Sequence, residues 1–154
     1  MQRSIVGFAQ DEVSDWVAIL ECGHRQHVRH NPPLVSRPWV LSREGRASQM
    51  GAFLQCVRCE RFELPEHYKP YRSSPVFTET TAPASLRKDH STRGGVWARI
   101  HVLEGQLRYV VDRWGTDVTL TPQTPGIVVP DVLHHIEPLG PVRFFVEFYA
   151  SPDA

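Results

Sequence analysis

Hydrophobic positions near the N-terminus of the chain form two short runs. Residues 4–10 and 15–21 are rich in isoleucine, valine, phenylalanine and tryptophan, and the mostly polar stretch 11–14 separates them. Two such runs joined by a short polar stretch predict a β-hairpin. Its second strand would deliver Cys22 at its end.

A helix is predicted after a proline-rich segment. Asn31-Pro32-Pro33 ends regular structure, because proline lacks a backbone N–H and restricts the residue before it. Ser42 is a suitable N-cap for a helix over residues 43–54. Helical spacing places four residues on one face of it: Ala47, Met50, Gly51 and Leu54.

The second half of the chain has the pattern of short strands. β-Branched and aromatic runs, separated by glycine and proline, cover residues 96–103, 107–112, 117–121, 126–129, 134–137 and 142–149. Such runs predict an antiparallel sandwich or barrel. Residues 64–71 are rich in proline and polar side chains, so we expect a domain boundary near residue 63. The chain is thus predicted to be mainly β, with a small α+β domain over residues 1–62 and a β-barrel domain over residues 63–154.

Composition narrows the class of protein. The chain is 41% hydrophobic and 22% charged with a formal net charge of zero, which is typical of a globular chain and not of a disordered one. No apolar run has the length of a signal peptide or a membrane span, so we expect a cytoplasmic protein without a membrane partner. Neither half has a strong basic excess, so no nucleic-acid partner is expected. The oligomeric state stays open, with a homodimer as one option.

The three cysteines have the spacing of metal ligands. Cys22-Gly23-His24 and Cys56-Val57-Arg58-Cys59 are two close pairs, which the hairpin and the end of the helix would bring together. Zinc binds four thiolate or imidazole ligands in a tetrahedron. We therefore predict a structural zinc site formed by Cys22, His24, Cys56 and Cys59.

Other interpretations of these residues stay open. Cys56 and Cys59 could form a redox pair, but no thioredoxin-like pattern surrounds them, and the cysteines could also simply pack in a core. The fourth zinc ligand is the least defined, because His27 follows His24 by three residues. We favour His24 over His27.

Two segments of the second half resemble the metal-binding motifs of cupins, which are small barrels around a pocket. The first contains His90 and the turn Val102-Leu103-Glu104-Gly105, and the second contains Pro130 to His134. Two departures are clear: Thr92 replaces the second histidine of the first motif, and Ala98 stands near the usual glutamate position. His90 and His134 are therefore the expected pocket pair.

The strand that follows His90 suggests further pocket residues. Period-two alternation places Trp97, Arg99, His101 and Leu103 on one face, and we expect this face to point inward. Arg99 or Glu137 would then orient the histidine pair. His90 and His134 could bind a metal, form a metal-free catalytic pocket, or be hydrogen-bonded structural groups.

Two family resemblances cover nearly the whole chain. Residues 1–62 resemble a small bacterial family of uncharacterised proteins through Ile5-Val6-Gly7-Phe8, Cys22-Gly23-His24, Arg37-Pro38-Trp39 and Cys56-x-x-Cys59. Residues 64–150 resemble the TehB/YeaR-like domain through Leu64-Pro65, His90-Ser91-Thr92, Gly95-Val96-Trp97, Val102 to Gly105 and His134 to Pro138. This resemblance implies a cupin-like domain named for tellurite resistance. It supports His90 and His134 as family positions but not His101, where other members commonly have threonine or serine.

The resemblance also limits the expected function. In TehB proteins this domain precedes a methyltransferase that uses S-adenosylmethionine, whereas YeaR-like proteins lack it and are linked to nitrate and nitrite response. No Gly-x-Gly-x-x-Gly fingerprint occurs here, so methyl transfer is not implied. We expect a metal-binding accessory protein of oxyanion or metal stress, with structural zinc and a cupin pocket for a small molecule, an anion or a second metal. The alternative is a metal-dependent cupin enzyme, an oxygenase or isomerase, that uses His90 and His134.

Overall fold

The computed structural model describes residues 1–153. The chain forms two compact units, one spanning Met1–Cys59 and the other running from Glu60 to the end of the described residues. The predicted domain boundary near residue 63 lies just beyond this division.

The N-terminal unit is built on one antiparallel sheet with the strand order β3-β2-β1-β4. Its strands are β1 (Gln2–Gln10), β2 (Trp16–Leu20), β3 (Arg25–His27) and β4 (Phe53–Gln55). β1 and β2 form the predicted hairpin, with Gln10 opposite Trp16. Buried Ile5, Val17 and Leu20 contribute to its core.

The helix of this unit is shorter than predicted. A 3-10 helix, η1 (Pro38–Leu41), precedes α1 (Arg43–Ser48), and a single turn, α2 (Val57–Glu60), follows β4. The predicted N-cap is confirmed, because the Ser42 hydroxyl accepts a hydrogen bond from the Gly45 amide at 2.9 Å. The expected extension to residue 54 is wrong. Gly51 has a φ of 84°, which a helix does not accommodate, and the chain then pairs with β1 as β4.

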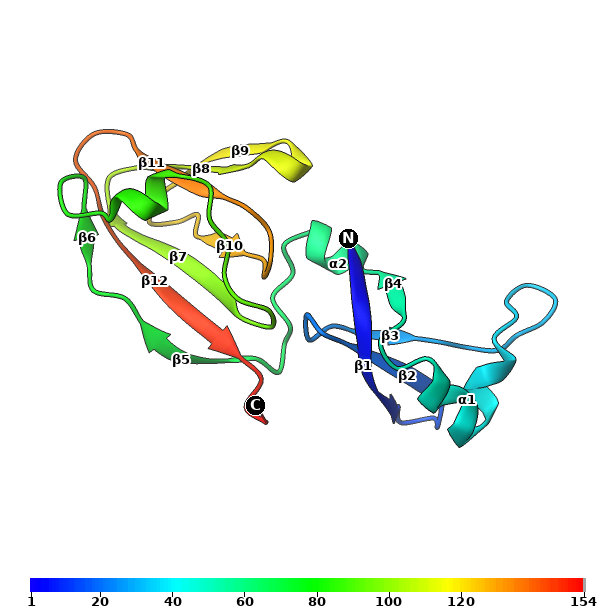
Figure 1. Ribbon diagram of the computed structural model, residues 1–154. Coiled ribbons are helices and arrows are strands. Elements are labelled where there is room, and N and C mark those ends of the chain that lie inside the picture. The colour runs from blue at the N-terminus through cyan, green and yellow to red at the C-terminus, as the bar shows by residue number, and fades with distance from the viewer. Residues whose placement is uncertain (154) are drawn as a thin grey trace. The chain divides into compact units, whose positions relative to one another are not determined.

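The C-terminal unit contains two antiparallel sheets (Figure 1). The larger has the order β10-β7-β12-β5, with β6 also paired to β12, and the smaller has the order β11-β8-β9. The elements are β5 (Lys69–Ser73), β6 (Phe77–Thr78), η2 (Ala84–Arg87), β7 (Trp97–Glu104), β8 (Leu107–Val111), η3 (Asp112–Trp114), β9 (Thr116–Leu120), β10 (Gly126–Val128), β11 (His135–Pro138) and β12 (Arg143–Ala150).

The predicted mainly β fold with antiparallel sheets is confirmed. The expected runs after residue 96 correspond to strands, with small shifts at their ends. Two strands of this unit, β5 and β6, were not predicted, and β5 begins inside the segment predicted to be a linker. All five residues of β5 are exposed, so this strand has no hydrophobic periodicity and forms through its pairing with β12. No helix among the described residues is long and apolar enough to span a membrane.

The turn after β7 provides a test of backbone geometry. Gly105 has a φ of +81°, and a Cβ atom there would lie 2.2 Å from the Pro141 carbonyl oxygen. Gly140 also has a positive φ, +93°, but its Cβ position is open. In both Gly105→Ala and Gly140→Ala, the left-handed backbone conformation destabilises the folded state by about 1–3 kcal/mol. Only the Gly105→Ala methyl group also clashes with the Pro141 backbone.

We therefore expect Gly105→Ala to lower the thermal midpoint of the C-terminal unit more than Gly140→Ala does, by about 5 °C or more. Thermal unfolding followed by circular dichroism measures both variants. Equal midpoints for the two variants would show that the turn relaxes around the added methyl group.

Candidate functional site

Four side chains from separated segments form a buried cluster in the N-terminal unit. Cys22 and His24 lie in the turn between β2 and β3, where Gly23 has a φ of 92°. The Leu20 amide donates to the His24 carbonyl at 3.0 Å, which closes this turn. Cys56 follows β4, its amide donates to the Met1 carbonyl at 2.8 Å, and Cys59 lies in α2. The sheet and the turn thus bring both ligand pairs to one point.

The ligand atoms of this cluster lie within 4.8 Å of one another, and all four residues are buried. His24 Nδ1 lies 3.4 Å from Cys22 Sγ, 3.2 Å from Cys56 Sγ and 3.7 Å from Cys59 Sγ. The sulfurs of Cys22 and Cys56 are 3.9 Å apart. One imidazole N–H cannot donate to three sulfurs at once. Cys22, His24, Cys56 and Cys59 therefore form a cluster that could hold a metal ion.

The electrostatics of the cluster favour a bound cation. Hydrogen bonding with Cys56, then with Cys59, raises the pKa of Cys22. The pKa of Cys56 is lowered by hydrogen bonding with the Cys22 thiol, which is the largest cause, and with the Cys59 thiol. Neighbouring thiol protons can thus stabilise one buried thiolate. Three thiolates in so small a buried volume require a cation to compensate their charge.

The neighbouring histidines lie outside this cluster. His27 is about half exposed, and its Nε2 lies 2.7 Å from an oxygen of Asp11. His30 Nδ1 accepts a hydrogen bond from the Arg37 amide at 2.9 Å. Among the residues that the structure describes, the four-residue cluster is the one group of three or more such side chains with this ligand geometry. The geometry therefore selects His24 and not His27.

The C-terminal unit contains a cavity of about 670 Å³, which is within the range of small-molecule pockets. Cross-strand pairing builds its wall on the larger sheet. One row of neighbours runs Val128, Ala98, Phe148 and Arg72 across four strands, and all four line the cavity. A second row includes Ile100 and Val146. Ile136 of β11 contributes to the lining from the smaller sheet.

His90 and His134 meet at this cavity. Their backbones form an isolated antiparallel bridge, with amide-to-carbonyl distances of 3.0 and 2.9 Å. Their ring centroids are 4.2 Å apart, and both residues line the cavity. The two histidines thus lie side by side although 43 residues separate them in the sequence.

Backbone carbonyls orient the two imidazoles. His90 Nδ1 lies 3.0 Å from the Lys88 oxygen, and His134 Nδ1 lies 3.1 Å from the Val132 oxygen. A carbonyl oxygen only accepts, so each Nδ1 carries a proton, and Nε2 is the ring nitrogen that can hold a lone pair. Burial lowers the pKa of His134 to about 4, which keeps that ring neutral near pH 7.

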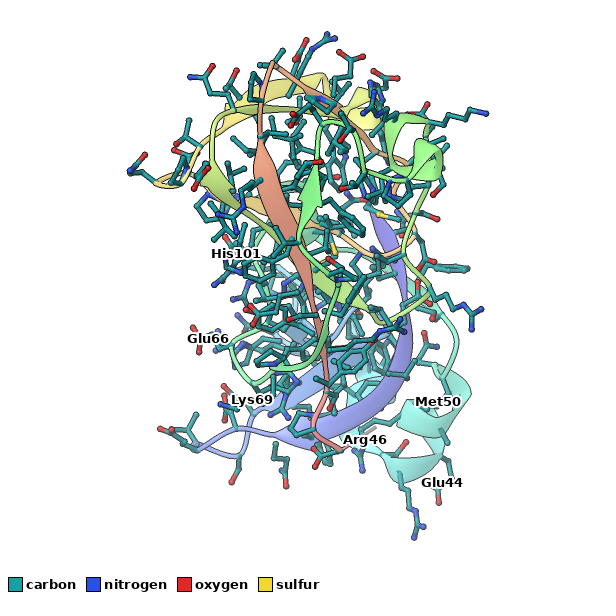
Figure 2. The ribbon with its side chains drawn as sticks, turned by 90° about the vertical axis from the view of Figure 1, so that its left-hand side faces the viewer. Glu44, Arg46, Met50, Glu66, Lys69 and His101 are labelled. Atoms are coloured by element: carbon teal, nitrogen blue, oxygen red, sulfur yellow. The ribbon has the colours of Figure 1, made fainter. Side chains whose placement is uncertain are left out.

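The four other expected pocket residues do not line the cavity. Trp97, Arg99 and His101 lie on the face of β7 opposite to Ala98 and Ile100. Of these residues, His101 is labelled in Figure 2. His101 Nε2 lies 3.1 Å from Glu147, and the Arg99 guanidinium lies over the ring of Tyr149 at 5.5 Å. Glu137 accepts from Arg108 at 2.7 Å. Neither Arg99 nor Glu137 therefore orients the histidine pair, contrary to expectation. The alternation along the strand was correct, but its inward face carries the smaller apolar residues.

Sequence reasoning missed Arg72 and Arg93, which both line the cavity. Arg72 lies on β5, the strand without a hydrophobic pattern. Arg93 follows His90 by three residues in an irregular loop. Only the proximity of Arg93 to the cupin-like motif could have suggested it.

Comparison with known families divides the chain in a similar way. The family described as "Protein of unknown function (DUF3565)" matches residues 6–63, and the TehB-like domain matches residues 72–146. YeaR of Escherichia coli strain K12 is 26% identical over 101 residues, which cover 59% of this chain and 85% of that protein. TehB of Haemophilus influenzae, a probable S-adenosyl-L-methionine-dependent methyltransferase, is 29% identical over 75 residues, which cover 46% of this chain and only 26% of TehB.

Solved structures support the same relationship. The crystal structure of TehB from Haemophilus influenzae superposes with a TM-score of 0.51 at 25% identity, and covers 56% of this chain and 32% of that one. A crystal structure of a protein from Escherichia coli strain K12 has a TM-score of 0.54 at 24% identity, and covers 64% of this chain and 98% of that one. The latter likeness concerns the fold alone. The chain therefore joins an N-terminal DUF3565 domain to a C-terminal TehB-like domain, and it is homologous to YeaR and TehB.

Proposed function

We propose that this chain is a metal-binding accessory protein of oxyanion or metal stress. In this proposal a structural zinc ion stabilises the N-terminal unit, and a cupin-type cavity in the C-terminal unit binds a small ligand. The Cys22, His24, Cys56 and Cys59 cluster is the observation that carries it. The association with stress rests on the match to the TehB-like domain, which is named for tellurite resistance. The proposed compartment is the cytoplasm, where thiols stay reduced.

The cluster has the dimensions of a zinc site. With Zn–S bonds of about 2.3 Å and Zn–N bonds of about 2.0 Å, a tetrahedron separates two sulfurs by about 3.8 Å and a sulfur from a nitrogen by about 3.5 Å. The sulfurs of Cys22 and Cys56 are 3.9 Å apart, and His24 Nδ1 lies 3.2 to 3.7 Å from the three sulfurs. Three thiolates and one imidazole favour zinc over magnesium or calcium, which prefer oxygen.

The burial of all four ligands supports a structural role for the ion. A catalytic zinc keeps one coordination position open for water or substrate, whereas a structural zinc has four protein ligands. The ion would also add folding free energy to a unit of only 59 residues, which is small for a core without other support.

The runner-up function is a metal-dependent enzyme that uses His90 and His134. The paired rings favour it, because their Nε2 lone pairs are available for a second metal. The rest of the lining does not support it, since no aspartate or glutamate is among the described residues that line the cavity. Two neutral imidazoles alone would bind a divalent ion weakly.

Metal analysis of the purified full-length protein distinguishes the two functions. We expect about one equivalent of zinc per chain, because one complete set of four ligands is present. Elemental analysis by plasma mass spectrometry measures this ratio. A second equivalent, of zinc or of iron, manganese or nickel, that His90→Ala removes would favour the enzyme. Protein that folds without any metal would refute the zinc site.

A further inference from the structure

The cavity of the C-terminal unit combines an apolar wall with an unusual set of polar groups. The rows across β10, β7, β12 and β5 contribute aliphatic and aromatic side chains, among them Ile100, Phe144 and Phe148. Such a wall stabilises the apolar body of a ligand by removing its surface from water. A ligand that uses this wall would therefore be larger and less polar than a simple inorganic ion.

The charged groups of the lining are all of one sign. Arg72 and Arg93 line the cavity, and no acidic side chain does so among the described residues. Neither guanidinium has a hydrogen-bond or ion-pair partner within the described part of the chain. Asp89, next to His90, has its Oδ1 at 2.9 Å from His135 Nδ1, so this carboxylate is hydrogen-bonded to His135 and not to either arginine. A guanidinium fork pairs with a planar carboxylate through two parallel hydrogen bonds.

The histidine pair adds hydrogen-bond acceptors. Nδ1 of His90 and Nδ1 of His134 both donate to backbone carbonyls, so Nε2 is the ring nitrogen left to accept from a ligand hydroxyl. The low pKa of His134, caused by burial, keeps its Nε2 available as an acceptor near pH 7. A metal dication at this pair would lack a carboxylate ligand and would be repelled by the two arginines.

We infer that this cavity binds a small organic anion, namely a carboxylate on an aromatic or aliphatic body that also carries a hydroxyl group. The inference rests on the proposed small-ligand pocket and specifies the class of ligand for it. The carboxylate pairs with Arg72 and Arg93, the body packs on the apolar rows, and the hydroxyl donates to the histidine pair.

Calorimetric titration of the full-length protein with four probes tests this inference. The probes are 4-hydroxyphenylacetate, phenylacetate, 2-(4-hydroxyphenyl)ethanol and acetate. We expect 4-hydroxyphenylacetate to bind most tightly. The alcohol should bind at least tenfold more weakly because it lacks the carboxylate, and acetate should bind more weakly still because it lacks the apolar body.

Variants assign the binding to the cavity. Arg72→Gln and Arg93→Gln should each weaken 4-hydroxyphenylacetate at least tenfold, and His134→Asn should reduce its advantage over phenylacetate. Arg113→Gln is the matched control, because Arg113 is exposed and does not line the cavity. It should leave the affinity unchanged.

The possible outcomes distinguish failure of this inference from failure of the proposed small-ligand pocket. If the alcohol binds as tightly as the acid, the cavity is a ligand pocket without anion selectivity, and only the inference fails. If acetate equals the aromatic acids, the apolar wall has no role and the inference also fails. If no probe binds while the zinc content is stoichiometric, both the inference and the small-ligand pocket are refuted, and the zinc site stands.

Discussion

Replacing Cys59 with serine is expected to release the metal and unfold the N-terminal unit, while the C-terminal unit stays folded. Structural zinc contributes about 10–16 kcal/mol in small zinc domains at neutral pH, which is comparable to the whole stability of a typical domain. Cys59 is fully buried in the cluster, and a serine hydroxyl is a poor zinc ligand. The loss of one ligand therefore removes most of the stabilising free energy of this unit.

Zinc content and hydrogen exchange measured by mass spectrometry check this result. Peptides from residues 1–59 should lose protection, and peptides from residues 97–149 should keep it. His24→Ala should behave like Cys59→Ser, whereas His27→Ala is the matched control and should retain zinc, because His27 pairs with Asp11 outside the cluster. Stoichiometric zinc in both Cys59→Ser and His24→Ala would rule out this site.

Acidification from pH 7 to pH 4 is expected to destabilise the C-terminal unit by about 3 kcal/mol through His134, at about 1.4 kcal/mol per pH unit below the unfolded pKa. Burial lowers the pKa of His134 to about 4, and the charge of His90 acts in the same direction. In the unfolded chain this pKa is near its usual value of 6.5. Between these values the unfolded state binds a proton that the folded state excludes, so stability is full above pH 6.5 and falls as the pH drops.

Urea unfolding of the full chain at several pH values between 4 and 7.5 measures this dependence. Hydrogen exchange of peptides from the C-terminal unit reports the unfolding of that unit. His134→Asn should flatten the pH dependence in this window, because its amide can still donate to the Val132 carbonyl but does not titrate. His67→Asn, which changes a histidine outside the cavity, should leave it unaltered. An unchanged slope in His134→Asn would mean that His134 titrates normally in the folded state.

Local pattern was sufficient for most of the N-terminal site. The hairpin, the N-cap at Ser42 and the two ligand pairs follow from short-range spacing, which the sequence records directly. The preference for His24 over His27 was uncertain from the sequence, and the tertiary structure supports it by placing His24 in the cluster. In the structure, β2 pairs with β3 and leaves His27 beside Asp11, a contact between residues that no local pattern connects.

For the cavity, local sequence pattern was less informative than the tertiary structure. Motif spacing indicated His90 and His134, but their side-by-side position arises from a backbone bridge across 43 residues. Alternation along β7 predicts two faces and does not say which one points inward. Trp97 on one face and Ala98 on the other are both fully buried, so hydrophobicity does not distinguish the faces.

The sequence by itself determined the mainly β class, the metal-ligand pairs and the two histidines, because each depends on residue type and local spacing. Only the tertiary structure decided that α1 ends at Ser48, that Lys69–Ser73 is a strand and that Arg72 and Arg93 reach the cavity. Those features depend on pairing between distant segments. An edge strand such as β5 has all its side chains exposed, so its conformation follows from the hydrogen bonds of its neighbour β12 and not from its own sequence.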